Sequence, residues 1–547
     1  MSELTRQHVA STPIAVPTTE EGPRVETTAG PVRGLWRRIV SAPDRQGPAP
    51  LFTRSAAFYG IPYAEVPFGE RRFMAPVRRA GWTQERTALT PSATPQRGSI
   101  FDDPAIPEPS VPGEDFLTVN VFTPTPGDEG ARLPVLVWIH GGGWSSGSHN
   151  SPWYDGAAFN RDGVVTVSVA YRLGYDGYGW VPGSDAPYNR AVLDQVMALE
   201  WVRDNIARFG GDPEQVTVAG QSAGGGNSMV LLAVPRAKGL FHRIISQSGA
   251  LPERSASTTQ EMSRTLAQVL GVELSLEGIR SATYDEVFEA SRKVTAPDGA
   301  GLAGLADPVE ALRGVLSQSG SDIPFLPTVD GEVIALDEVE ALRSGWGAKV
   351  PVLAGSTMHD FAFAGLGMAE AMKGKDLREV LVAGGLSEEI AERVIAAHPE
   401  HADAPHMVVG DLISDATFHK VVAEWFLARQ EAAAGEGTTS AGSYAYEFAY
   451  CAGPLHMATH CMDIPFTFDC LADPYCEHTL GGGAPQELAD AMHGVWVSFI
   501  REGQPGWESW TERSVGRCFG DNRAGEMSLQ EDRVLFDTDR DLVAASR

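Results

Sequence analysis

The sequence predicts an α/β protein built around a mostly parallel sheet, and three observations lead to this fold class. Short apolar runs rich in Val and Ile, typical of buried strands, occur at Leu133–Ile139 and Val164–Ala170. Between Arg190 and Ala207 apolar residues recur at steps of three and four, as on one face of a helix. Another apolar run follows at Val216–Ala219. This strand, helix, strand order has connections of the length that parallel strands need.

The helix predicted from Arg190 places five apolar residues on one face and has a clear end. The sequence Phe-Gly-Gly-Asp-Pro at 209–213 contains the residue types that stop a helix. Further strands are expected at Val350–Ala354 and Tyr444–Phe448. The region 253–322 has helical patterns and is expected to form a cap or gorge wall over the carboxyl edge of the sheet, where ligands bind in such folds. The helical face consists of Val192, Val196, Leu199, Val202 and Ile206.

Composition limits the classes of partner. The chain has 547 residues, of which 43% are hydrophobic and 21% charged, which is enough to form a large globular core. Its 71 acidic and 43 basic residues give a formal net charge of −28. Nucleic acid and anionic membrane surfaces would be repelled by this charge. We therefore expect a small-molecule substrate, no nucleic-acid partner and no membrane partner.

The N-terminus and the cysteines bear on the cellular compartment. Residues 1–25 are rich in Thr, Pro and Glu and have no apolar core behind a basic start, so they are predicted to be a disordered tail without a signal peptide, unless one was already removed. No run reaches the 18 apolar residues of a membrane span. The five cysteines all lie in the last fifth of the chain, with no CxxC pair that would indicate zinc. Reduced thiols in a cytoplasm are the simplest explanation.

Ser222 is the predicted nucleophile. It lies within Gly220-Gln-Ser-Ala-Gly224, a pattern in which serine occupies a sharp turn between a strand and a helix. The same pattern occurs around Ser145, but a loop rather than a helix follows there. Only Ser222 has a strand before it and a helix-compatible run after it, at 227–233. Ser145 is therefore expected to be structural.

A glycine run predicts an oxyanion hole. His-Gly-Gly-Gly-Trp at 140–144 follows the strand that ends at Ile139. Glycines at this point let backbone N–H groups approach a substrate oxygen without a Cβ in the way. The expected donors are Gly142, Gly143 and Ala223, and the alternative is a flexible turn.

These motifs and several others resemble the type-B carboxylesterases, the family of bacterial para-nitrobenzyl esterases, animal carboxylesterases and cholinesterases. The resemblance covers residues 28 to 510 and implies one large α/β-hydrolase domain with insertions, over residues 26–547. It implies a serine esterase whose nucleophile is followed in the chain by an acid and then a histidine. The further motifs are FYGIPYA at 58–64, EDFLTVNV at 114–121, AYRLG at 170–174, LDQ at 193–195 and QSG at 247–249.

The resemblance also implies the other two members of the triad. His460 begins the segment His-Cys-Met-Asp-Ile-Pro-Phe, which is similar to the segment that carries the family's catalytic histidine. His456 is the competitor, but its spacing to the proline is wrong. Asp463 matches the acidic position of this segment and is not the expected triad acid.

Asp360 is the predicted triad acid. It follows the strand expected at Val350–Ala354 and falls where the family carries a glutamate. An aspartate can also orient the imidazole and stabilise the imidazolium, provided that the backbone lies closer. Glu370 is the second candidate, and a solvated surface carboxylate is the alternative for either residue.

Two departures from the family pattern narrow the expected activity. Gln221 stands where many members carry glutamate, which argues against cationic choline-type esters. Phe116 replaces a cysteine that many secreted members use in a disulfide, which favours a bacterial-type, intracellular enzyme. Trp144, Trp153 and Tyr154 could line a pocket or pack in the core.

The predicted reaction is acyl transfer through Ser222, with no cofactor and no metal required. The same triad could act mainly on carbamates, lactones, thioesters or aryl amides. A different class of function is a non-catalytic, cholinesterase-like adhesion module, although such proteins usually lose the serine or the histidine. The sequence leaves the natural substrate and the choice between monomer and homodimer open.

Overall fold

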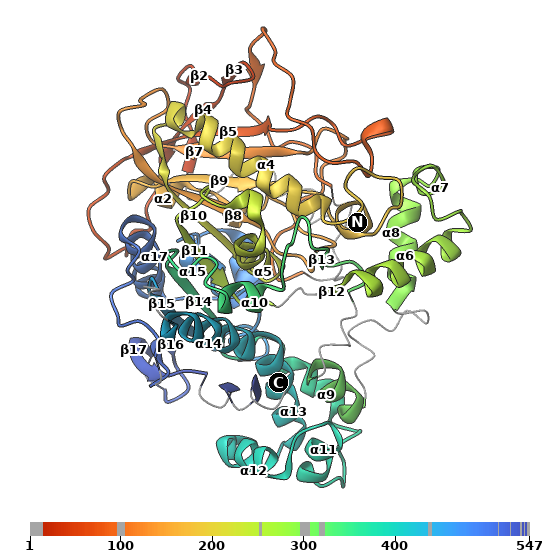
Figure 1. Ribbon diagram of the computed structural model, residues 1–547. Coiled ribbons are helices and arrows are strands. Elements are labelled where there is room, and N and C mark those ends of the chain that lie inside the picture. Colours follow the sequence, from red (N-terminus) through yellow and green to blue (C-terminus); the bar gives the residue numbers. More distant parts are fainter. Residues whose placement is uncertain are drawn as a thin grey trace.

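The protein, described here from a computed structural model, is organised around one large twisted sheet (Figure 1). The structure describes residues 15–95, 104–250, 254–295, 307–316, 323–435, 440–511, 513–525, 527–536, 539–540 and 542–543. The 12 strands lie in the order β1-β4-β5-β7-β9-β8-β10-β11-β14-β15-β16-β17. The seven strands from β9 to β16 are parallel to one another, and the strands on either side of them pair antiparallel. This is the α/β class that the sequence predicts.

The bounds of the strands match the predicted runs closely in the middle of the sheet. The runs expected from residues 133, 164 and 216 correspond to β8, β9 and β10, and those expected from residues 350 and 444 correspond to β14 and β15. β10 is longer than predicted because it already begins at Gly211, beside Leu133 of β8. The strands of the sheet are β1 (Ala15–Pro17), β4 (Leu35–Ile39), β5 (Arg54–Pro62), β7 (Thr118–Thr123), β8 (Leu133–Ile139), β9 (Val165–Val169), β10 (Gly211–Gln221), β11 (Arg243–Gln247), β14 (Val352–Thr357), β15 (Ser443–Phe448), β16 (Val515–Asp521) and β17 (Ser528–Val534).

Helices cover both faces of the sheet, and alternate side chains of each strand point to opposite faces. In β8, Val135, Val137 and Ile139 belong to one core cluster, whereas Leu136 and Trp138 belong to the other. The first cluster includes side chains of α4 (Arg190–Asn205), α5 (Ala223–Val230) and α14 (Lys420–Ala434), and the second includes those of α15 (Ile464–Thr467) and α17 (Gln486–Glu502). A parallel sheet buried on both faces explains why its strands read as continuous apolar runs.

Helix α4 confirms the predicted amphipathic helix and its end. Its five predicted apolar positions are all buried. The helix continues as one 3₁₀ turn over Ile206–Phe209 and stops at Gly210, whose φ of 81° is left-handed. Glycine adopts this conformation without the penalty that a Cβ brings.

The N-terminal segment differs from the sequence prediction. Residues 15–25 were expected to belong to a disordered tail, but Ala15–Pro17 pairs antiparallel with β4 as the edge strand of the sheet. Strand β2 (Arg24–Glu26) pairs with β3 (Pro31–Arg33) in a small separate sheet that also contains β6 (Arg86–Thr87). Backbone pairing and the burial of Ala15 and Val25 order this polar segment, although its composition is typical of disorder. Residues 1–14 lie outside the described residues.

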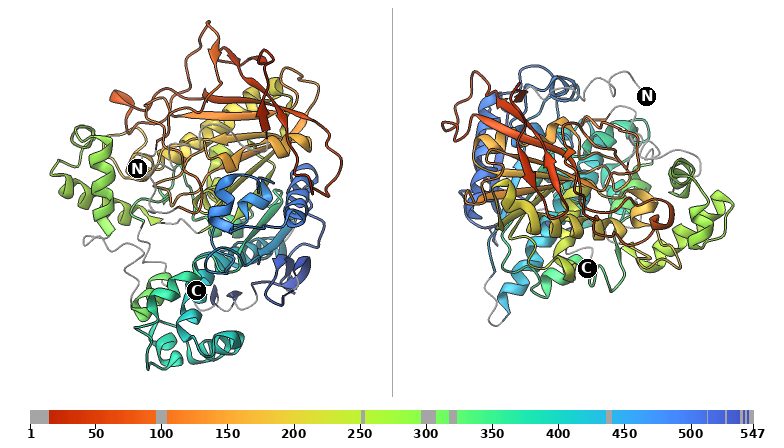
Figure 2. Two further views of the ribbon diagram at one scale, coloured as in Figure 1. Left: turned by 180° about the vertical axis from the view of Figure 1, so that it is seen from behind. Right: turned by 90° about the horizontal axis from the view of Figure 1, so that it is seen from above.

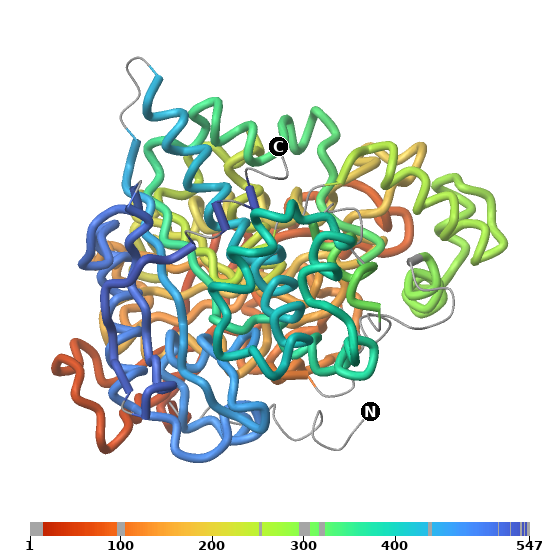
Figure 3. The backbone as a smooth tube through the Cα atoms, turned by 90° about the horizontal axis from the view of Figure 1, so that it is seen from below, coloured from red at the N-terminus to blue at the C-terminus, as the bar shows by residue number. Residues whose placement is uncertain are grey.

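In its described residues, the region expected to be mostly helical contains four helices, which lie in two places. Helices α6 (Ala256–Leu270), α7 (Leu276–Arg280) and α8 (Tyr284–Thr295) project at one side of the molecule (Figure 2). Helix α9 (Pro308–Leu316) instead packs with helices that come later in the chain, in a separate apolar cluster. The backbone of these helices is seen from below in Figure 3. We call this group the α9–α13 lobe. Its later helices are α11 (Leu377–Ala383), α12 (Glu388–Ala397) and α13 (Pro405–Ser414), with the 3₁₀ segment η7 (Ala362–Met368) packed against α13.

The remaining helices and short strands complete the described fold. They are α2 (Ala157–Arg161), α3 (Gly174–Tyr178), α10 (Glu338–Arg343), α16 (Pro474–Leu480), and the paired short strands β12 (Arg254–Ser255) and β13 (Thr328–Val329). None of the helices in the described ranges has both the length and the apolar character needed to cross a bilayer. All five cysteines are free thiols, and four of them are buried.

Candidate active site

The predicted site residues converge at one edge of the sheet. Strands β8, β10, β14 and β15 run parallel within one set of neighbouring strands, so their carboxyl ends meet at the same edge. The glycine run follows β8, Ser222 follows β10, Asp360 lies three residues after β14, and His460 lies in the loop that leaves β15. Four segments that are distant in the sequence are thereby brought together by topology.

Ser222 occupies a sharp turn between β10 and α5. Its backbone angles are φ 59° and ψ −127°, a conformation that a residue with a side chain adopts only at an energetic cost. The neighbouring glycines permit the turn, because a Cβ on Gly220 would lie 2.4 Å from the backbone of Gly224. A Cβ on Gly224 would lie 2.0 Å from the carbonyl oxygen of Ile139. Strand, strained serine and helix follow one another as the motif predicts.

The glycine run lies beside Ser222. A Cβ on Gly141 would lie 3.1 Å from the Cβ of Ser222, so the two backbones approach closely. Gly142 and Gly143 have φ values of 110° and 57°, which glycine tolerates. Within the described residues, the N–H groups of Gly142 and Gly143 make no intramolecular hydrogen bond. The N–H of Ala223 begins α5 and so has no partner within the helix.

His460 and Asp360 form a short buried pair. The Nδ1–H of His460 donates to Oδ1 of Asp360 at 2.5 Å, and the backbone N–H of His460 donates to the Asp360 carbonyl at 3.1 Å. The Asp360 side chain is fully buried, whereas that of His460 remains 13% exposed. Burial disfavours the imidazolium, but interactions with Cys461 and with Asp360 outweigh burial and raise the pKa of His460. The pair therefore stabilises the imidazolium that forms when His460 accepts a proton.

Gln221 contacts the second nitrogen of the same imidazole. Its side-chain amide Nε2 lies 3.1 Å from Nε2 of His460. Because Nδ1 of His460 carries the proton shared with Asp360, Nε2 is the free acceptor and the Gln221 amide donates to it. Gln221, the residue immediately before Ser222, thus holds Nε2, the imidazole nitrogen that is expected to act as the base.

Two phenylalanines enclose the His460 ring. The ring centroids of Phe361 and Phe418 each lie 4.8 Å from that of His460. Phe418 belongs to a short π-helical stretch, Asp415–His419, between α13 and α14, and such stretches often occur at functional sites. Sequence reasoning missed the contact of both rings with His460. Phe361 directly follows Asp360, so its place in the chain was a signal, whereas Phe418 comes from a distant element and no local motif indicates it.

A second carboxylate lies behind the pair. Asp463 is fully buried, and its Oδ2 accepts hydrogen bonds from Nε2 of Gln247 at 2.8 Å and from the hydroxyl of Tyr446 at 2.9 Å. Burial raises the pKa of Asp463 to about 6, although these two hydrogen bonds oppose the rise. The QSG motif gave a signal for Gln247, whereas nothing local indicated Tyr446.

The rival candidates lie in other surroundings. Ser145 is in a turn where its hydroxyl donates to the Gly143 carbonyl at 3.2 Å. His456 is exposed, and Glu370 is 83% exposed and pairs with Lys373. The aromatic residues Trp144, Trp153 and Tyr154 are buried in the two core clusters, which agrees with the core alternative for all three.

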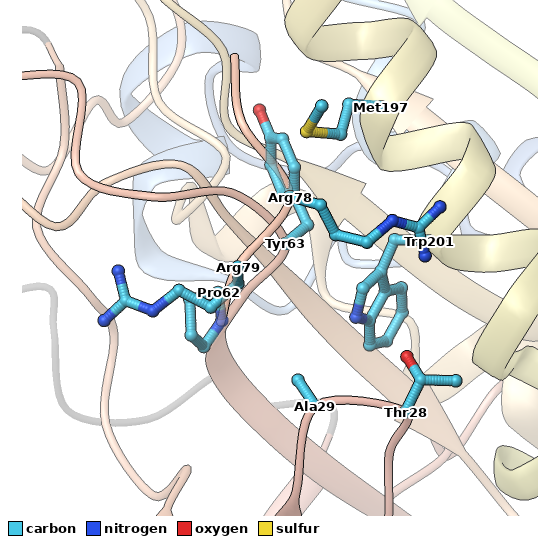
Figure 4. Close-up of a pocket in the computed structure, with 8 residues that line it drawn as sticks. All are labelled: Thr28, Ala29, Pro62, Tyr63, Arg78, Arg79, Met197 and Trp201. Atoms are coloured by element: carbon cyan, nitrogen blue, oxygen red, sulfur yellow. The ribbon is translucent and has the colours of Figure 1, made fainter. Parts of the chain in front are cut away.

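A separate surface hollow lies away from these residues (Figure 4). It has a volume of about 220 Å³ and is lined by parts of β5, α4 and two loops. Its two arginines are already paired, Arg78 with Asp204 at 2.6 Å and Arg79 with Asp115 at 3.1 Å. The lining residues are Thr28, Ala29, Pro62, Tyr63, Arg78, Arg79, Met197 and Trp201.

Comparison with known proteins shows the family to which the chain belongs. The para-nitrobenzyl esterase of Bacillus subtilis is 29% identical over 82% of this chain and 87% of its own length. The phenmedipham hydrolase of Pseudarthrobacter oxydans is 31% identical over 82% of this chain and 86% of its own. The crystal structure of a Geobacillus stearothermophilus carboxylesterase superposes with a TM-score of 0.74 at 29% identity, covering 96% of this chain and 100% of the other. The model of the carboxylesterase family matches residues 21–531, and the chain therefore belongs to the carboxylesterase family.

Proposed function

We propose that Ser222, His460 and Asp360 are the catalytic triad of this carboxylic ester hydrolase. The observation that carries the proposal is the 2.5 Å contact between His460 and Asp360 at the sheet edge that also bears Ser222. Asp360 fixes the tautomer in which Nε2 of His460 accepts a proton, and it stabilises the imidazolium that forms. The shorter aspartate serves in place of glutamate because its own backbone carbonyl also binds the backbone N–H of His460.

The reaction proceeds by acyl transfer. His460 removes the proton of the Ser222 hydroxyl, and Ser222 Oγ attacks the ester carbonyl carbon to form a tetrahedral oxyanion. The N–H groups of Gly142, Gly143 and Ala223 donate to this oxyanion, and each such donor is worth about 2.7–4 kcal/mol in the transition state. The alcohol leaves with the proton from His460. Water then takes the place of the alcohol: His460 removes a proton from it, its oxygen attacks the acyl carbon, and Ser222 leaves with the proton.

Three neighbouring side chains support these steps. Gln221 is a positioning residue, because its amide holds the His460 ring through Nε2 until the substrate and Ser222 take over that contact. Phe361 and Phe418 cover the ring and limit the access of water to the His460–Asp360 pair. Gln221 is neutral, so this position offers no negative charge to a cationic ester. We infer a preference for uncharged esters.

The organisation and location of the enzyme are further parts of the proposal. We infer one domain that begins earlier than the residue 26 expected from the sequence, because a single sheet takes its strands from residues 15 to 534. Free thiols and a net charge of −28 favour a bacterial-type enzyme in the cytoplasm, with small esters rather than nucleic acids as partners.

Hydrolysis of p-nitrophenyl acetate tests the assignment of the nucleophile. Ser222→Ala should reduce kcat by a factor on the order of 10⁶, as expected when a triad serine is removed. Ser145→Ala is the matched control, since Ser145 occupies the same sequence pattern, and it should retain most of the activity. An active Ser222→Ala protein, or an inactive and folded Ser145→Ala protein, would contradict the proposal.

A further inference from the structure

Two histidines and two carboxylates meet in the α9–α13 lobe, outside the proposed active site. His398 ends α12, Glu400 and His401 lie in the 3₁₀ turn Pro399–His401, and Asp411 lies on α13. Nδ1 of His398 is 3.3 Å from Oε1 of Glu400 and 3.5 Å from Oδ2 of Asp411. Nε2 of His401 is 3.0 Å from the same Oδ2 of Asp411.

The distances between His398, Glu400 and Asp411 are compatible with binding of all three side chains to one metal ion, as well as with hydrogen bonds. Zinc binds nitrogen and oxygen ligands at about 2.0–2.2 Å in a tetrahedron, which sets neighbouring ligand atoms about 3.3–3.6 Å apart. The two contacts of His398, at 3.3 and 3.5 Å, fall in this range and are longer than good N–H···O hydrogen bonds, which measure about 2.7–3.2 Å. The three ligand atoms of His398, Glu400 and Asp411 all lie within 4.8 Å of one another.

Charge also favours a cation at this place. Among the described residues, neither Glu400 nor Asp411 forms an ion pair with a lysine or an arginine. Asp411 is only 7% exposed, so its carboxylate is largely removed from water. One divalent ion would balance the charges of the two carboxylates. The Glu400 side chain is 54% exposed, which leaves the site open to an ion from solvent.

We propose that His398, Glu400 and Asp411 bind a divalent transition-metal ion of the zinc type, with water completing its coordination, and that His401 holds Asp411 in place by a hydrogen bond. Imidazole nitrogens select such ions over Mg²⁺ and Ca²⁺, which take oxygen ligands. The ion would tie the turn after α12 to α13, and α13 leads through the π-helical stretch to Phe418. The site is distinct from the triad, and this inference does not depend on the proposed ester hydrolysis.

Calorimetric titration of the tag-free protein with Zn²⁺ tests the site, after treatment with EDTA and dialysis. We expect one equivalent to bind with a dissociation constant of about 1 μM or tighter, a higher melting temperature with Zn²⁺ by linkage, and no binding of Mg²⁺ or Ca²⁺. His398→Asn should weaken Zn²⁺ binding at least about tenfold, because it removes one of three protein ligands. His401→Asn should weaken it less, because it removes only a hydrogen-bond partner of Asp411.

Two controls locate the ion. His406→Asn changes a histidine of the same helix outside the cluster and should leave Zn²⁺ binding unchanged. Asp539→Asn tests the group formed by Asp415, His419 and Asp539, the other described cluster with metal-type ligands, and should also have no effect. Comparing melting temperatures in EDTA separates loss of the ion from loss of folding. No stoichiometric binding, or binding that His398→Asn does not weaken, would overturn the proposal.

Discussion

His460 and His493 are both held by an aspartate, but they differ in what their second ring nitrogen meets. Nε2 of His493 lies 3.0 Å from Asp162, and its Nδ1 lies 2.8 Å from the Thr467 carbonyl oxygen. His460 presents Nδ1 to Asp360 and leaves Nε2 facing the side chain of Gln221. A carbonyl partner is fixed in the backbone, whereas a glutamine side chain can move aside.

The surroundings of the two histidine–aspartate pairs also differ, because one pair lies in the core and the other at the edge of the sheet. The His493 side chain is 3% exposed, lies on α17 and packs against Phe159 in the core of one sheet face. Its partner Asp162 also binds Arg161 at 2.6 Å. His460 lies instead at the carboxyl edge of the sheet beside the strained Ser222. A histidine–aspartate pair thus becomes a candidate for catalysis through its position and its free nitrogen, not through the pair alone.

Replacing His460 should have the largest effect on activity. His460→Gln removes the base, so we expect kcat to fall by a factor on the order of 10⁶ with little change in the melting temperature. Stopped assays with p-nitrophenyl acetate measure the loss. If His460→Gln retains more than about one hundredth of the wild-type kcat, the two histidines do not differ as described.

Removing the charge of Asp360 should have the next largest effect. Asp360→Asn keeps the size of the side chain but reverses the hydrogen bond to Nδ1, and we expect a loss of about 10⁴-fold in kcat. Because Asp360 raises the pKa of His460, the variant's residual kcat/KM should reach its plateau at a lower pH than that of the wild type. A pH profile unchanged in both height and position would show that Asp360 does not act on His460.

Sequence reasoning reached the triad but not the shell around it. β8, β10 and the turn at Ser222 follow from local patterns, because apolar runs and the G-x-S-x-G motif require nothing from distant residues. The approach of Phe418 to His460 and the cluster around Asp411 depend on how helices pack on one another, the latter at the turn between α12 and α13, and no periodicity encodes these contacts. The pairing of Ala15–Pro17 with β4 was missed for the same reason, since composition alone indicated a tail.

Replacing Gln221 should have a smaller effect on activity, which appears mainly in the pH profile of kcat/KM. In Gln221→Glu a carboxylate replaces the amide near Nε2 of His460 and favours the imidazolium, which raises the pKa of His460. We therefore expect the acid limb of kcat/KM to move to higher pH by about 0.5–1 unit. Gln221→Met keeps the length of the side chain without charge and should move the limb less. Equal shifts in both variants would exclude the electrostatic explanation.

His493 should have the smallest effect on activity. His493→Gln should leave kcat within about twofold of the wild type, because neither ring nitrogen takes part in the reaction. Its loss leaves buried hydrogen-bonding groups without a partner, so urea denaturation should show a decrease of about 1–3 kcal/mol in the free energy of unfolding. An inactive His493→Gln protein that folds normally would remove the distinction between the two pairs.

The most direct test of the account is to map the serine that forms a covalent intermediate. Wild-type protein and the Ser145→Ala, His460→Gln and His493→Gln variants would be treated with a fluorophosphonate probe, digested and analysed by mass spectrometry. We predict one adduct, on Ser222, in the wild-type, Ser145→Ala and His493→Gln proteins, and almost none in His460→Gln. An adduct on another serine, or labelling of Ser222 that does not require His460, would contradict the account.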